Sequence, residues 1–132
     1  MTIKEVSEKY GLTNYTLRYY EKSKIIPPIK KVNGIRNYTD LDCRWIEFMK
    51  CMRDAGVPVD VLARYFELVK YGESTREERK QILINQRATM KEKIKIMQAS
   101  VDKLNHKIDN FDTIVKRVEN ELIDELNDKQ NS

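Results

Sequence analysis

The sequence is short of the residues that build disulfide-rich, strand-rich or membrane-spanning proteins. Its 132 residues include two cysteines, which favours free thiols over a disulfide framework. Four glycines and three prolines leave few turns, and this favours long helices over many short strands. No apolar run approaches the roughly 18 residues that cross a bilayer, and no apolar signal-peptide stretch is present at the start. We therefore expect a cytoplasmic, mainly α-helical protein without a membrane partner.

The residues that catalysis and metal binding use most are equally scarce. His106 is the single histidine, and we find neither a Ser-His-Asp set nor a glycine-rich phosphate loop. Cys43 and Cys51 lie eight residues apart, which is about 12 Å along one helix. That separation is too large for a shared metal ion or for a disulfide within one chain. We expect no enzyme activity, no metal site and no cofactor.

Positive charge is concentrated at the start of the chain. Residues 1–38 carry eight Lys and Arg against three Asp and Glu, whereas residues 111–132 carry three against six. A basic segment indicates a polyanionic partner such as nucleic acid, although a solvated basic surface would give the same count. Charge by itself leaves these two interpretations open.

The first forty residues contain a helix-turn-helix pattern followed by a hairpin. A capping box at Thr2 predicts a helix over 3–10, and Thr13 caps a second helix over 14–22. Two short helices around the break at Gly11 are typical of a helix-turn-helix. Beyond them the sequence predicts two short strands, 29–32 and 35–38, which Asn33 and Gly34 join as a type I′ turn, so that the hairpin forms a wing.

Two further helices complete the first domain, which we assign to residues 1–72. Thr39 with Asp42 caps a third helix that ends near Ala55, and Pro58 suits the first turn of a fourth helix that ends near Tyr71.

A long amphipathic helix follows, because residues 73–132 contain neither Gly nor Pro. Thr75 and Glu78 form another capping box at its start. Apolar residues recur every seven positions in two series offset by four, which predicts a coiled coil more strongly than a helix lying on its own domain. We expect a dimerisation helix over 73–127 and a disordered tail over 128–132. The predicted seam consists of Leu83, Met90, Ile94, Met97, Val101, Leu104, Ile108, Phe111, Val115, Val118 and Leu122.

Charges beside the seam indicate the direction of pairing. Lys91 and Lys93 flank it early, and Glu119 and Glu121 flank it late. An antiparallel pair centred near His106 would place each lysine opposite a glutamate of the partner. We therefore predict an antiparallel homodimer.

The second helix and the hairpin carry side chains that suit duplex DNA. Arginine can bind guanine as a fork, asparagine can pair with adenine, and Tyr and Thr hydroxyls reach phosphates. Leu17 and Tyr20 fit the core better than a DNA contact. The expected DNA-binding residues are Thr13, Asn14, Tyr15, Thr16, Arg18, Tyr19, Lys31 and Arg36. A coiled-coil adaptor would explain residues 73–132 but not this motif.

The run TLRYYE at 16–21, with NGIRNY at 33–38, resembles the MerR family of winged-helix regulators. The resemblance covers essentially the whole chain and implies a homodimer on a pseudo-palindromic promoter operator. It also implies untwisting of an over-long promoter spacer, through which RNA polymerase is engaged indirectly. It assigns DNA contacts to Arg18 and Tyr19, and to Arg36 and Tyr38 of the wing. Lys24 departs from the family pattern, in which a glycine commonly ends the second helix.

The inducing signal is suggested by the run WIEFMKCMRDAG at 45–56. It resembles the aldehyde- and nitrosative-stress-responsive subgroup (NmlR/AdhR-like), which has a functional cysteine at the position of Cys51. Lys50 and Arg53 favour a thiolate there, whereas the nearby helix C-terminus disfavours one. Local chemistry alone favours a small buried hydrophobe, and the resemblance favours a sensor of electrophiles, aldehydes or oxidants. Cys43 falls at an apolar position and is expected in the core.

A regulator driven by a small non-covalent ligand or by a partner protein is the alternative, with Cys51 only structural. A ligand pocket between helices would draw on the aromatic residues Trp45, Tyr65, Phe66 and Tyr71, although such residues more often serve core or dimer packing.

Overall fold

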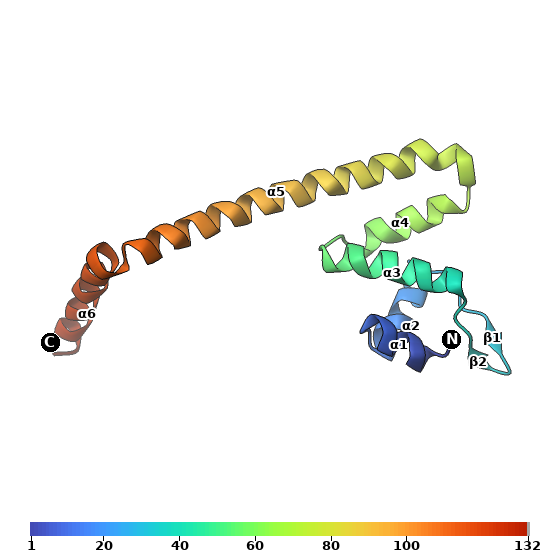
Figure 1. Ribbon diagram of the computed structural model, residues 1–132, viewed down its shortest axis with the longest axis horizontal. Helices are drawn as coiled ribbons and strands as arrows, with labels where there is room; N and C mark the ends of the chain where they lie inside the picture. The colour runs from blue at the N-terminus through green and yellow to red at the C-terminus, as the bar shows by residue number, and fades with distance from the viewer. Residues whose placement is uncertain (132) are drawn as a thin grey trace. The chain divides into compact units, whose positions relative to one another are not determined.

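The computed structural model describes residues 1–131, which form helices and one hairpin (Figure 1). The chain divides into two compact units, residues 1–88 and the residues from Thr89 on. The first unit extends past residue 72, where the sequence suggested a domain boundary. The elements are α1 (Ile3–Tyr10), α2 (Asn14–Lys22), β1 (Lys31–Val32), β2 (Ile35–Arg36), α3 (Asp40–Asp54), α4 (Val59–Val69), the 3₁₀ helix η1 (Gly72–Thr75), α5 (Arg76–Asp109), the π-helical turn η2 (Phe111–Val115) and α6 (Lys116–Asn131).

Local capping interactions fix the ends of the first two helices, and the predicted helix-turn-helix is confirmed. The Thr2 hydroxyl accepts a hydrogen bond from the backbone N–H of Glu5 at 3.2 Å, and the Glu5 carboxylate accepts one from Thr2 N–H at 3.1 Å. Gly11 ends α1 with a left-handed backbone, φ 64°. The Thr13 hydroxyl then caps α2 by accepting from Thr16 N–H at 3.0 Å.

The hairpin forms at the predicted turn but with shorter strands. Lys31 pairs with Arg36 and Val32 with Ile35 in antiparallel register. Asn33 and Gly34 both have positive φ, 52° and 78°, which a type I′ turn requires. The strands are two residues long, and just outside them Asn37 N–H still donates to the Lys30 carbonyl at 2.9 Å. Beyond that pair, the positions predicted as strand bond elsewhere. Tyr38 N–H, for example, donates to the carbonyl of Met1 at 2.8 Å.

The core of the first unit gathers apolar residues from α1, α2, α3 and α4 and from the segments that connect them. Leu17 and Tyr20 are buried, as predicted, and so is Cys43. Trp45 packs edge-on against Phe66 with ring centroids 5.3 Å apart. The remaining buried apolar residues are Val6, Ile25, Ile26, Ile29, Tyr38, Ile46, Met49, Val57, Leu62 and Leu68.

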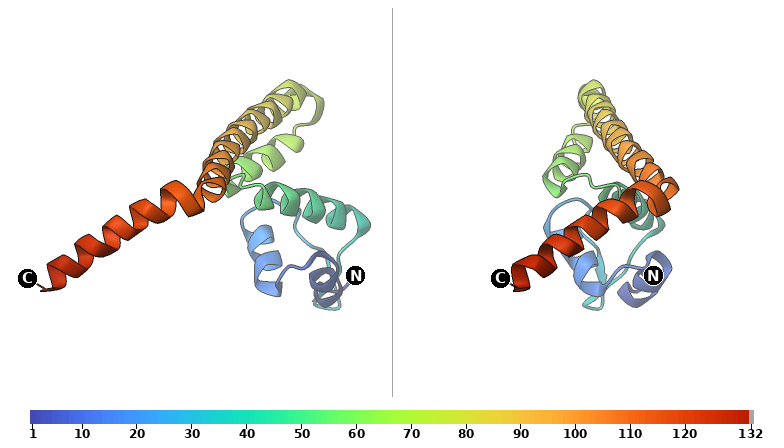
Figure 2. Two further views of the ribbon diagram at one scale, coloured as in Figure 1. Left: turned by 60° about the vertical axis from the view of Figure 1, so that its left-hand side comes forward. Right: turned by 90° about the vertical axis from the view of Figure 1, so that its left-hand side faces the viewer.

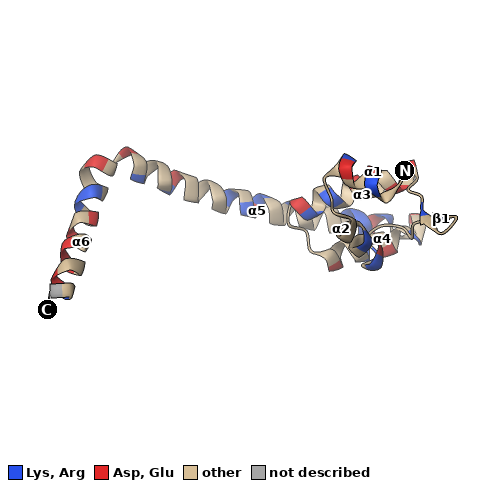
Figure 3. Cartoon of the chain, turned by 90° about the horizontal axis from the view of Figure 1, so that it is seen from below, with Lys and Arg blue, Asp and Glu red and all other residues tan. Residues whose placement is uncertain are grey.

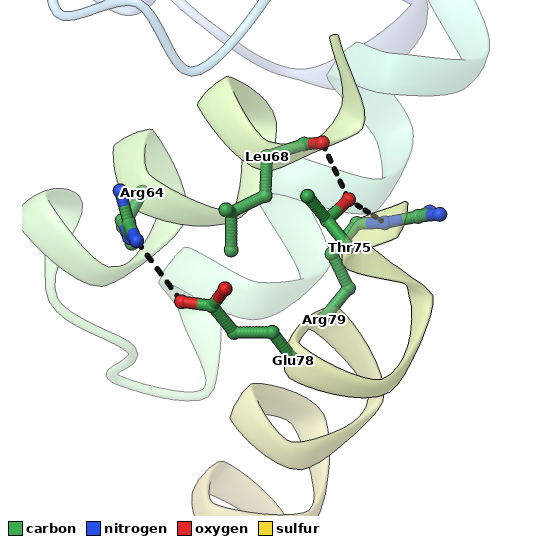
Figure 4. A network of polar contacts seen from close by, with 5 residues as sticks. All are labelled: Arg64, Leu68, Thr75, Glu78 and Arg79. Atoms are coloured by element: carbon green, nitrogen blue, oxygen red, sulfur yellow. Dashed lines mark hydrogen bonds and ion pairs between the residues drawn. The ribbon is translucent and has the colours of Figure 1, made fainter. Parts of the chain in front are cut away.

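The junction between α4 and α5 differs from the predicted capping box. Thr75 is the last residue of η1, and its hydroxyl donates to the Leu68 carbonyl at 2.7 Å (Figure 4). The same oxygen accepts from Arg79 Nε at 3.1 Å. Glu78 reaches across to Arg64 at 2.9 Å instead of bonding back to the helix start. The prediction was wrong because these tertiary partners on α4 take both side chains.

The second unit holds the rest of α5, the turn η2 and α6, and it corrects the continuous helix predicted over 73–127. The helix breaks at Asn110, whose backbone lies at φ −107° and ψ 16° (Figure 2). The Asn110 side chain donates to the His106 carbonyl at 2.9 Å, and Val115 N–H donates to the Asn110 carbonyl five residues back. Asn110 N–H also donates to the His106 carbonyl at 3.1 Å, so the change to the π-helical turn begins after this residue. The antiparallel register centred near His106 was predicted for one straight helix, and α5 ends only a few residues after His106.

The end of α6 also differs from the prediction. We expected a disordered tail over 128–132, but residues 128–131 continue α6, and residue 132 lies outside the described residues. Within residues 1–131, every helix is too short or too polar to cross a membrane.

Candidate nucleic-acid interface

The face of α2 that points away from the core collects most of the predicted DNA-binding residues. Tyr15 is 79% exposed and Tyr19 43% exposed, whereas Leu17 and Tyr20 on the opposite face are buried. A shallow hollow on the exposed face is lined by Tyr15, Arg18, Tyr19, Lys22 and Ser23. Sequence analysis did not single out Lys22 or Ser23, although helical spacing from Arg18 and Tyr19 places them on this face.

Two of the predicted contacts already bond to each other at the start of α2. The Thr13 and Thr16 hydroxyl oxygens lie 2.8 Å apart, and Thr13 also caps the helix. Asn14 and Tyr15 are exposed at the same helix terminus. Recognition helices direct their N-terminal turn at the base edges in the major groove. In α2 this turn presents the amide of Asn14 and the phenol of Tyr15.

The wing is attached to α2 by an ion pair. Arg36 Nε lies 3.0 Å from a carboxylate oxygen of Glu21, and both side chains are partly buried. Lys31 stands directly opposite Arg36 in the hairpin and is exposed. Figure 3 marks the Lys and Arg residues of this unit in blue. The ion pair holds Arg36 in position and leaves its terminal guanidinium nitrogens without another partner among the described residues.

Tyr38 is placed differently from the expectation. Its side chain is 2% exposed, and its hydroxyl is buried without a hydrogen-bond partner among residues 1–131. Desolvation raises the pKa of this phenol above its ordinary value, and nearby Arg36 opposes the shift only in part. The prediction of a surface contact was wrong for this conformation, because Tyr38 backbone pairing with Met1 turns the ring into the core.

Cys51 lies in the last turn of α3 and is exposed. Local chemistry alone predicted that Cys51 is a small buried hydrophobic residue, and its exposure shows that this prediction was wrong. The two cations that we expected to favour its thiolate are engaged elsewhere. Lys50 Nζ pairs with Asp54 at 2.7 Å, which raises the lysine pKa, and Arg53 Nη1 donates to the Val57 carbonyl at 2.7 Å.

An apolar cavity of about 220 Å³ lies on the outer side of α3 and α4. Of the four aromatic residues predicted to build a pocket, Trp45 and Tyr65 line it, whereas Phe66 is buried and Tyr71 is exposed elsewhere. The other lining residues are Leu41, Arg44 and Phe48, which sequence analysis missed although their helical spacing from Trp45 places them on the same face of α3.

The predicted dimer seam is exposed in the single chain. No residue of α5 is buried, and Ile94 and Met97 are 67% and 68% exposed. A row of large apolar side chains in water indicates a surface that another chain covers.

Metal ligands do not converge in this structure. Across residues 1–131, no group of three or more His, Cys, Asp and Glu side chains is arranged to hold a metal ion.

Comparison with known proteins identifies the family. The profile described as MerR HTH family regulatory protein matches residues 1–68, which is half of the chain. The chain belongs to the MerR family. It is 49% identical over 88 residues to the HTH-type transcriptional regulator AdhR of Bacillus subtilis (strain 168), a match that covers 66% of this chain and 63% of AdhR. It is 31% identical over 108 residues to an HTH-type regulator of Haemophilus influenzae, covering 81% of this chain and 80% of that one.

Solved structures agree with this assignment. A MerR family regulator from Listeria monocytogenes aligns with a TM-score of 0.82 at 41% identity, covering 98% of each chain. HiNmlR, a MerR family regulator lacking the sensor domain and bound to promoter DNA, aligns at 0.76 and 30% identity, covering 83% of this chain and 88% of that one. The predicted helix-turn-helix domain followed by a long helix is confirmed, and so is the NmlR/AdhR-like subgroup. This MerR protein is a DNA-binding transcriptional regulator, as its named relatives are, and not an enzyme.

Proposed function

We propose that this MerR protein binds a pseudo-palindromic promoter operator as a homodimer and remodels it when Cys51 reacts with an electrophile, an aldehyde or an oxidant. The observation that carries the proposal is the exposed thiol of Cys51 in α3, on the same compact unit as the exposed face of α2. The unpartnered apolar seam of α5 supports the homodimer, and the basic wing supports binding to the operator backbone.

In the dimer, each α2 enters a major groove and each wing, through Lys31 and Arg36, contacts the adjacent backbone. Arg18 and Tyr19 contribute from the middle of α2. The dimer sets the spacing of the two recognition helices, so a change in that spacing alters the twist of the promoter and engages RNA polymerase indirectly. The DNA-binding residues that we propose are Thr13, Asn14, Tyr15, Thr16, Arg18, Tyr19, Lys31 and Arg36.

The chemical trigger is addition to the Cys51 sulfur. With an aldehyde, the thiolate forms a carbon–sulfur bond to the carbonyl carbon, and the carbonyl oxygen takes a proton from water. The adduct adds bulk in the last turn of α3, where the Cys51 carbonyl accepts a hydrogen bond from Ala55 N–H at 3.1 Å, just before the turn at Gly56. That location couples the modification to the α3–α4 turn.

The decisive experiment measures intact mass and DNA-dependent transcription on the same samples after mild exposure to an electrophile or to diamide. Wild type, Cys51→Ala and the matched control Cys43→Ala are compared. We expect an adduct on Cys51 and changed transcription in wild type and in the Cys43 variant, whose altered thiol is buried. An unmodified Cys51, or an equal response in Cys51→Ala, would show that Cys51 is not the sensor.

The aromatic cavity on α3 and α4 favours a second candidate, a regulator driven by a small non-covalent ligand. Trp45 lines this cavity and is the single tryptophan of the chain, so its fluorescence reports occupancy directly. A ligand that changes Trp45 emission and transcription equally in wild type and Cys51→Ala would favour this candidate. Phe48→Ala would then weaken the response by enlarging the cavity and removing a ring contact.

A further inference from the structure

Lys24, two residues after the end of α2, has a backbone conformation suited to glycine. In the described chain, six residues have left-handed backbone, and four of them are the four glycines of the sequence. Asn33 is the fifth, in the wing turn, and asparagine tolerates this region. Lys24, at φ 61°, is the exception. The ends of α1, α3 and α4 are followed by a left-handed glycine, whereas the end of α2 is followed by a left-handed lysine.

The fold requires this conformation at Lys24. Its N–H donates to the Glu21 carbonyl at 3.2 Å, and the next residue, Ile25, donates to the Tyr20 carbonyl at 3.2 Å. This pair of bonds closes the C-terminus of α2 and turns Ile25 into the core, where it is fully buried. A lysine at this position carries a steric penalty that glycine would not, because its Cβ approaches the following carbonyl.

Among residues 1–131, the Lys24 side chain makes no hydrogen bond or ion pair that offsets this penalty. It is exposed, and its ammonium has no carboxylate within ion-pair distance among residues 1–131. What distinguishes it from glycine is therefore a positive charge at the end of the recognition helix. The hollow lined by Lys22 and Ser23 lies immediately before it in the chain. Strained residues of this kind cluster at functional sites.

We infer that Lys24 is a further DNA-binding residue, whose ammonium binds a backbone phosphate where the end of α2 meets the operator. The inference rests on the use of α2 as the recognition helix. An ammonium on a flexible stem suits a sequence-independent phosphate contact, and each such contact releases counterions from the duplex. Lys24 therefore adds affinity without base selectivity, at the cost of a less stable helix end.

The test separates stability from binding with Lys24→Gly, Lys24→Asn and Lys24→Arg. We measure urea unfolding of each dimer and binding to a random-sequence duplex over a series of salt concentrations. Lys24→Gly is expected to raise the folded-to-unfolded ratio about fivefold. Both neutral variants are expected to bind more weakly, with the slope of log affinity against log salt reduced by about 0.9. Lys24→Arg keeps the charge and is expected to keep the wild-type slope.

Lys95→Gln on α5 is the matched control, because it removes the same net charge from an exposed position of the coiled-coil helix. Its slope should equal that of wild type. A stability loss in Lys24→Gly would show that the lysine serves the fold, and an unchanged slope in both neutral variants would show that it contacts no phosphate. If Lys95→Gln changed the salt slope as much as the Lys24 variants do, the change would come from the net charge of the protein and not from a phosphate contact at Lys24. If wild type bound no duplex at all, α2 itself would not be the recognition helix, which is a different failure.

Discussion

Removing the hydroxyl of Tyr38 tests whether this residue serves the core or the DNA. The hydroxyl is buried without a partner, and an unsatisfied buried polar group costs about 1–3 kcal/mol. Tyr38→Phe keeps the ring, which is 2% exposed, and deletes only the unpaired oxygen. We expect the variant to be about 1 kcal/mol more stable, which corresponds to a rise in Tm of about 4–8 °C for a domain of this size. Urea unfolding followed by Trp45 fluorescence measures the change.

The pH dependence supplies an independent check on the same group. Desolvation raises the pKa of Tyr38 in the folded state, so the neutral phenol is favoured by folding. The stability that this shift contributes is fully present below the unfolded tyrosine pKa of about 10 and is lost as pH rises through the folded pKa. Above about pH 10, wild type should therefore lose stability faster than Tyr38→Phe. Tyr20, whose pKa burial also raises, titrates in both proteins and cancels in the comparison.

Two results would refute this reasoning. A Tyr38→Phe variant that is less stable than wild type at neutral pH would mean that the hydroxyl has a partner in solution. A variant of equal or greater stability that binds operator DNA at least tenfold more weakly would mean that Tyr38 turns outward in the complex and contacts DNA after all. Unchanged affinity with increased stability supports a purely structural position beneath the wing.

Three further changes test the wing, the helix junction and the seam. Glu21→Ala should lower the free energy of unfolding by about 1 kcal/mol or less, because it releases Arg36. Hydrogen exchange at the hairpin amides should become faster. Unchanged exchange would mean that the ion pair does not hold the wing. Thr75→Val should cost about 1 kcal/mol in urea unfolding by removing the buried hydroxyl bond to the Leu68 carbonyl, which then keeps the Tyr71 N–H at 3.1 Å. Ser74→Ala, whose hydroxyl bond is exposed, should cost less, and equal costs would contradict the argument. Ile94→Asp should weaken dimerisation by about tenfold or more in sedimentation equilibrium with helicity per chain retained, and an undisturbed dimer mass would place the interface elsewhere.

Two of the three errors in the prediction of the long helix arise from structure that its heptad pattern does not encode. The heptad pattern runs across Asn110 without interruption, so the pattern predicts one continuous helix. The backbone of Asn110 nevertheless leaves helical geometry and the next turn is π-helical, and periodicity carries no information about such a local change. The capping box at Thr75 failed similarly, because its two side chains found partners on α4.

The candidate site shows the same division. The exposed face of α2 followed from helical spacing, because Tyr15 and Arg18 had to lie opposite Leu17 once the helix formed. The burial of Tyr38 did not, because it depends on a backbone bond to Met1, distant in sequence. The exposure of Cys51 depended likewise on how α3 packs.

Features that arise between near neighbours could be predicted from the sequence alone. Caps at Thr2, Thr13 and Thr39, the Asn-Gly turn and the TLRYYE run are short-range signals, so they specify the helix-turn-helix, the wing and the family without reference to the rest of the chain. The three-dimensional packing was needed to show which side chains meet across elements, such as Arg36 with Glu21, and which polar atoms are buried without a partner. Those outcomes depend on desolvation and on packing between segments far apart in sequence, and no local pattern encodes them.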